Sequence, residues 1–64
     1  MIIIKTKSGS EYFIDTINKT VSGGKLRKTV SYTKCSALVG ESGVFYLSDG
    51  RILQTSTITA YLRA

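Results

Sequence analysis

Short runs of alternating apolar and polar residues recur along this chain, and each run is closed by glycine, asparagine, aspartate or serine. An alternation with a period of two is typical of β-strands with one buried face, and the closing residues are those that favour turns. The chain has 64 residues and no proline. No segment shows the period of an amphipathic helix. The pattern therefore predicts an all-β protein built from short strands.

The turn signals mark short extended segments at about residues 2–7, 11–15, 19–21 and 26–33, in the two arms of a hairpin around 49–50, and at residues 57–62. From these segments we expect a sheet of five or six strands. So few residues cannot build two stacked sheets of ordinary size. We therefore expect residues 1–64 to form a single domain, a strongly bent sheet or barrel of SH3-like kind. An OB-like barrel is the alternative, although that fold usually needs more residues and a helix.

The chain is too short for a large core, because a domain of this size buries only about 60% of its unfolded surface. Self-association is one remedy for such a small core. Cys35 is the only cysteine and the chain has no histidine. We therefore expect no disulfide, no metal or cofactor, and no catalysis of the Ser-His or Cys-His type. Cys35 is expected to pack in the fold.

The sequence also bears on location. A single cysteine fits a reducing compartment. The apolar start, residues 1–5, is far too short for a signal peptide or a membrane span. We therefore expect a cytoplasmic protein without a membrane partner.

Positive charge is the strongest functional signal. Nine lysines and arginines stand against four acids, which gives a net charge of +5. This balance suggests a polyanionic partner, either nucleic acid or a nucleotide, although charge can also simply keep a β-protein soluble. The densest positive run follows Gly23-Gly24, where backbone N–H groups can approach phosphates and Lys25 and Arg27 are expected to project to one side of a strand. The candidate polyanion-binding residues are Lys5, Lys7, Lys25, Arg27, Lys28, Tyr46 and Arg51.

Asp49-Gly50 predicts a hairpin with a two-residue type I′ turn. Such a turn pairs Leu47 with Ile52, Tyr46 with Leu53, and Phe45 with Gln54. On this register, Phe45, Leu47 and Ile52 share the core face.

The other face of that hairpin would carry Val44, Tyr46 and Leu53, beside Arg51. A fully solvated face does not usually gather such residues. Three explanations stay open: a second small core within the monomer, self-association, or contact with a ligand. The alternative to polyanion binding is therefore a protein-binding inhibitor or homo-oligomeric subunit that docks through Val44, Tyr46 and Leu53 as its interface.

Several stretches resemble small standalone phage-type β-barrel accessory proteins. These stretches are KSGSEYFID (7–15), NKTV (18–21) and the hairpin SDGRILQTS (48–56). The resemblance covers both ends of the chain and leaves the middle unmatched. It implies a one-domain accessory protein that works by binding, for example by blocking or sequestering a host component. It assigns no role to particular residues.

Overall fold

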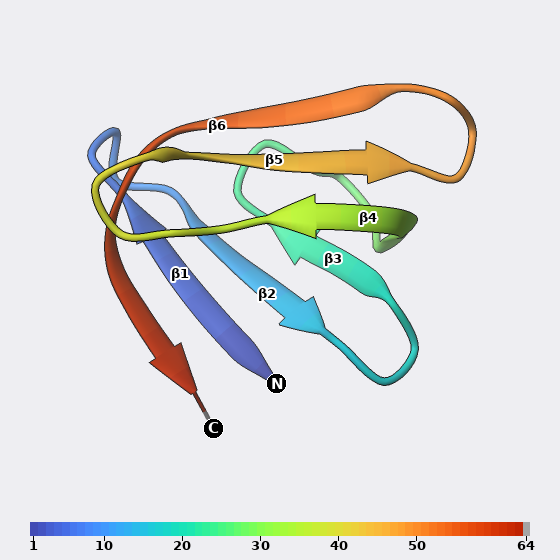
Figure 1. Ribbon diagram of the computed structural model, residues 1–64, viewed down its shortest axis with the longest axis horizontal. Helices are drawn as coiled ribbons and strands as arrows, with labels where there is room; N and C mark the ends of the chain where they lie inside the picture. Colours follow the sequence, from blue (N-terminus) through green and yellow to red (C-terminus); the bar gives the residue numbers. More distant parts are fainter. Residues whose placement is uncertain (64) are drawn as a thin grey trace.

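Six antiparallel strands follow one another around a closed barrel in the computed structural model, which describes residues 1–63 (Figure 1). They are β1 (Ile2–Thr6), β2 (Glu11–Asp15), β3 (Thr20–Gly23), β4 (Val30–Ser36), β5 (Ser42–Leu47) and β6 (Ile52–Arg63). Each strand pairs with the next, and β6 returns to pair with β1. The prediction of a small all-β barrel is confirmed. Because consecutive strands are neighbours throughout residues 1–63, this part of the chain has no Greek-key crossover of the OB kind.

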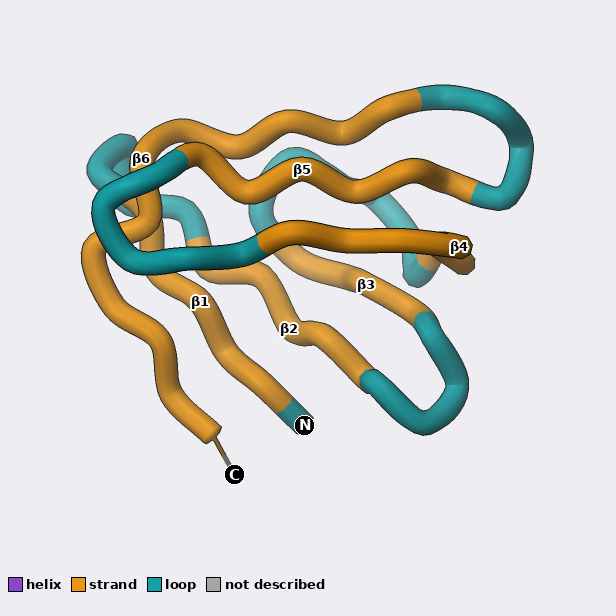
Figure 2. The backbone as a smooth tube through the Cα atoms, viewed as in Figure 1, coloured by secondary structure: helices purple, strands orange, loops and turns teal. Residues whose placement is uncertain are grey.

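The last strand closes the barrel. Figure 2 shows β6 as one long, bent strand, whose first half lies along β5 and whose second half lies along β1. The bend coincides with a bulge at Thr59, because Thr6 pairs with Ile58 whereas Lys5 pairs with Ala60. A bulge bends a strand and shifts the alternation of its side chains. The hairpin arm and the expected strand 57–62 are therefore a single element.

Among residues 1–63, nine apolar side chains are buried in the barrel interior. They are Ile2, Ile4, Tyr12, Ile14, Val21, Tyr32, Phe45, Leu47 and Ile58. The rings of Tyr32 and Phe45 meet edge to face, with centroids 5.9 Å apart. Full burial of a large apolar side chain contributes about 1.5–3 kcal/mol. This core therefore supplies the main stabilisation of the described residues.

The hairpin register differs from the predicted one by one residue. Tyr46 pairs with Ile52, and Phe45 pairs with Leu53. The Leu47 N–H donates to the Arg51 carbonyl at 2.8 Å, so three residues form the turn. A type I′ turn would need positive φ at Asp49 as well as at Gly50. Only the glycine, with φ of 92°, adopts such a conformation here.

This register places Ile52 on the outer surface with 62% of its area exposed, and turns Leu53 towards the core. The prediction of Ile52 as a core residue was therefore wrong. The interface expected from Val44, Tyr46 and Leu53 does not lie on one face, because Leu53 points the other way.

Two further expectations were wrong. The fourth strand begins at Val30, so Leu26 and the basic residues around it lie in a loop rather than on a strand. Cys35 is exposed instead of packed in the core. Its neighbour Tyr32 is buried, and burial, together with the nearby Cys35 thiol, raises the pKa of the Tyr32 hydroxyl.

Among residues 1–63, no helix could span a membrane.

Candidate functional site

The basic loop between β3 and β4 is anchored at its start by a buried tyrosine. Gly24 lies against the ring of Tyr12, so close that a Cβ at this position would lie 2.8 Å from Cε2 and nearer still to two other ring atoms. The Lys25 N–H donates to the Tyr12 hydroxyl at 3.4 Å, and the Leu26 N–H donates to the Gly23 carbonyl at 2.9 Å. These contacts hold the backbone from which the basic side chains project.

Two adjoining hollows open where this loop meets the turn between β5 and β6. One has a volume of about 270 Å³ and is lined by Lys28, Thr29, Val30, Ser31, Leu47, Ser48, Asp49 and Arg51. The other has a volume of about 290 Å³ and is lined by Lys25, Leu26, Arg27, Lys28, Val30 and Arg51. Since Lys28, Val30 and Arg51 line both, the hollows form one continuous surface. We call the four cations Lys25, Arg27, Lys28 and Arg51 the basic rim.

The β5–β6 turn is fixed against β4. The Ser48 N–H donates to the Ser31 carbonyl at 2.9 Å. Asp49 accepts the backbone N–H of Arg51 at 3.0 Å and the Arg51 Nε–H at 2.6 Å. The backbone hydrogen bond, followed by the guanidinium contact, holds the pKa of the Asp49 carboxyl below its ordinary value. This pair orients Arg51 through Nε and leaves its terminal nitrogens without a partner among residues 1–63.

The basic rim carries an excess of positive charge. Around the two hollows, four cationic side chains face one carboxylate, that of Asp49. Within residues 1–63, ion pairs form only between Lys5 and Glu11 and between Arg51 and Asp49. The three cations of the loop are therefore not neutralised by any acid in that part of the chain. Such a cluster favours an anion with several negative charges.

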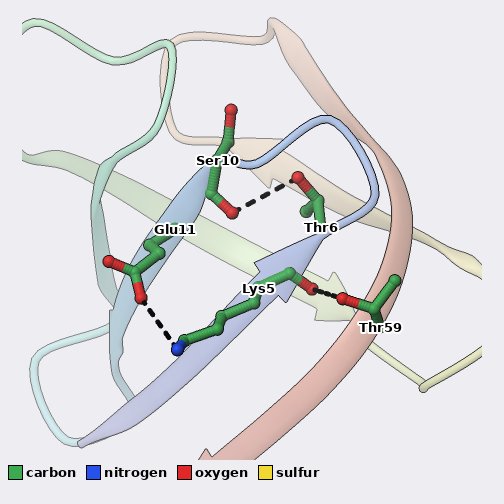
Figure 3. A network of polar contacts seen from close by, with 5 residues as sticks. All are labelled: Lys5, Thr6, Ser10, Glu11 and Thr59. Carbon is green, nitrogen blue, oxygen red and sulfur yellow. Dashed lines mark hydrogen bonds and ion pairs between the residues drawn. The ribbon is translucent and has the colours of Figure 1, made fainter.

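The structure thus brings four of the predicted polyanion-binding residues together and leaves two others apart. Lys5 lies on β1, where its ammonium approaches Glu11 at 3.6 Å and its carbonyl accepts the Thr59 hydroxyl (Figure 3). Lys7 lies in the β1–β2 turn, at the left end in Figure 1, whereas the β5–β6 turn lies at the right end. Neither Lys5 nor Lys7 lines a hollow.

Tyr46, the seventh predicted residue, lies beside the hollows rather than in them. Its partners across the neighbouring strands are Lys34 on β4 and Ile52 on β6. Directly paired residues point to the same side of a sheet. We call Lys34, Tyr46 and Ile52 the outer row. The predicted hairpin register had placed Ile52 on the opposite face from Tyr46.

The walls of the hollows were missed from the sequence. Leu26, Val30 and Leu47 supply apolar surface, and Thr29, Ser31 and Ser48 supply hydroxyl groups. Barrel closure brings these residues together from segments far apart in the chain. No local pattern marks them, so no sequence signal would have found them.

Comparison with protein-family models, curated proteins and solved structures finds no match to this chain.

Proposed function

We propose that this protein is a non-enzymatic binding module that holds a polyanion, a nucleic acid or a nucleotide, on its basic rim. The observation that carries the proposal is the meeting of Lys25, Arg27, Lys28 and Arg51 around two continuous hollows. Three of these cations have no ion-pair partner within residues 1–63. Phosphate groups would supply the missing negative charge. The proposal includes a reducing, cytoplasmic location for an exposed free thiol.

The experiment measures binding of a fluorescein-labelled, mixed-sequence nucleic acid as a function of salt concentration. Neutralising phosphates with lysine and arginine makes the affinity fall with salt, by a log-log slope of about −0.7 per phosphate on single strands and −0.9 on duplex DNA. We expect Lys28→Gln to weaken binding and to reduce the steepness of the slope by about one such unit.

Lys7→Gln is the matched control, because it removes the same charge at the opposite end of the barrel. We expect it to change the affinity far less than Lys28→Gln does. Equal losses in the two variants would show attraction to net charge without a site, and would overturn the proposal. An affinity insensitive to salt would overturn it as well.

A second candidate function is docking on a partner protein or on a second copy of the chain. It is favoured by the exposed apolar surface of Tyr46 and Ile52, which pair across β5 and β6 on the outside of the barrel. Size-exclusion chromatography with light scattering tests self-association. A dimer that persists at high salt and is lost in Ile52→Lys would support it, and a monomer at all salt concentrations would exclude the second copy.

A further inference from the structure

The outer row is exposed on the outside of the barrel. Tyr46 has 42% of its area exposed and Ile52 has 62%, and the two side chains face the same way from neighbouring strands. Cβ atoms of directly paired residues lie about 4.5–5.5 Å apart. Lys34 completes the row on the far side of Tyr46. An aromatic ring with apolar surface on one side and an ammonium group on the other is thus open to solvent.

The outer row and the basic rim are adjacent along the chain. Ile52 directly follows Arg51, which lines both hollows. Neighbouring strands lie about 4.8 Å apart, so the row from Ile52 to Lys34 spans roughly 10 Å. A ligand that extends from the hollows past Arg51 along this row would therefore meet Ile52 first, then Tyr46, and then Lys34.

The charges along this path are of one sign. The next pairs on the same outer surface are Ser36, Val44 and Gln54, none of which is acidic. Among residues 1–63, the carboxylate that lines the hollows is that of Asp49, which is already bonded to Arg51. From Arg51 the surface thus runs past the apolar Ile52 to the Tyr46 ring and then to the Lys34 ammonium group. Cations combined with exposed aromatic rings are what proteins use to bind single-stranded nucleic acids.

We propose that the ligand of the basic rim is a single-stranded nucleic acid, whose phosphates contact the rim and Lys34 and one of whose bases stacks on Tyr46. This inference rests on the proposed function and narrows it. In a duplex, both faces of a base are covered by its stacked neighbours, so Tyr46 would gain nothing from duplex DNA or RNA. In a single strand, the base faces are free, and every base offers a π-face to the ring. Leu26, Val30 and Leu47 likewise offer the hollows' apolar walls to an unpaired base or sugar.

The test compares three probes by fluorescence anisotropy: labelled oligothymidine of about ten nucleotides, a labelled DNA duplex of the same length, and unlabelled inorganic polyphosphate as competitor. The variants are Tyr46→Ala, Tyr46→Phe and Tyr61→Ala. Tyr61 is the matched control, because its exposure of 41% is almost equal and it lies on the other half of β6. Circular dichroism verifies that each variant is folded.

We expect oligothymidine to bind more tightly than the duplex. We expect Tyr46→Ala to weaken oligothymidine binding by about 5-fold to 150-fold, the range that corresponds to the loss of one stacked base. Tyr46→Phe keeps the ring and should bind like the wild type, as should Tyr61→Ala. Polyphosphate has no bases, so its affinity should be the same for the wild type and for Tyr46→Ala.

The outcomes separate the two proposals. Suppose that Tyr46→Ala binds oligothymidine as tightly as the wild type does, while Lys28→Gln binds it more weakly. The proposal that the basic rim binds a polyanion is then supported, and the inference that a single strand stacks on Tyr46 is overturned. A duplex that binds as tightly as oligothymidine also overturns it. If neither nucleic acid nor polyphosphate binds the wild type, the proposed function fails and the inference fails with it.

Discussion

Gly24 links the stability of the barrel to the position of the basic loop, and Gly24→Ala is the sharpest test of that link. The residue has a φ of +53°, and a Cβ there would overlap the ring of Tyr12, which is 1% exposed. Placing alanine in a left-handed conformation costs about 1–2 kcal/mol. Forcing a methyl group into a packed core costs about a further 1–3 kcal/mol. The expected loss in the free energy of unfolding is therefore about 2–5 kcal/mol.

Gly40→Ala separates the two contributions. Gly40 also has a positive φ, of +93°, but a Cβ there would meet nothing within 4 Å. Gly40→Ala should therefore lose only the free energy of placing alanine in a backbone conformation with positive φ, without the cost of an overlap with the core. Gly24→Ala should accordingly be less stable than Gly40→Ala by about 1–3 kcal/mol. In a domain of this size, 1 kcal/mol shifts Tm by about 4–8 °C. The whole free energy of unfolding of a 64-residue domain is only about 3–10 kcal/mol, so Gly24→Ala brings the protein near the limit of folding.

The assay is urea unfolding followed by circular dichroism, with the double variant Gly24→Ala/Tyr12→Leu as a further comparison. Leucine lacks the ring atoms that the new methyl group would overlap. The double variant should therefore lose less stability than the sum of the two single variants, by about 0.5–3 kcal/mol. Equal stabilities of Gly24→Ala and Gly40→Ala, together with additive effects in the double variant, would refute the packing of Gly24 on Tyr12.

Three other predictions follow from the core, the hairpin and the turns. Phe45→Ala should cost about 3–5 kcal/mol and leave the chain largely unfolded by circular dichroism, because this ring is fully buried. In urea unfolding, Leu53→Ser should lower the free energy of unfolding clearly, whereas Ile52→Ser should change it by no more than about 0.5 kcal/mol. The reverse order would contradict this register and favour the two-residue turn. Hydrogen bonds, first from the Asn18 backbone at Asp15 and from the Arg51 backbone at Asp49, hold the pKa of each carboxyl below its ordinary value. The stabilisation that these carboxylates supply is therefore complete above the ordinary carboxyl pKa and is lost as pH falls through the lower pKa values of the folded state. Asp49→Asn should flatten the acid side of the stability profile measured by urea unfolding, and an unchanged profile would contradict this.

The fold class could be predicted because the pattern that specifies it is local. Alternating runs such as Glu11–Asp15 bury every second side chain in any sheet that has one covered face. The turn residues mark where such runs end, and the shortness of the chain favours closure. The cationic segment Lys25–Lys28 could be located in the same way, because its charges are neighbours along the chain.

The hairpin face could not be predicted, because it depends on a single residue of register. Asp49-Gly50 fits a two-residue turn and a three-residue turn equally well from sequence, yet the two turns exchange Ile52 and Leu53 between outside and inside. The bulge at Thr59 acts in the same way on β6. Both choices are decided by how the strand must bend to close the barrel.

Alternation, turn chemistry and net charge are properties of neighbouring residues and of composition, so the amino-acid sequence is enough to predict an all-β protein with an excess of positive charge. Which of the cations form a site depends on how the strands pair. Lys28 and Arg51 line the same hollows because the β5–β6 turn packs on the start of β4, while Lys5 and Lys7 are carried to other parts of the barrel. The barrel sets these distances through strand pairing between remote segments, and no local pattern of residues encodes such pairing.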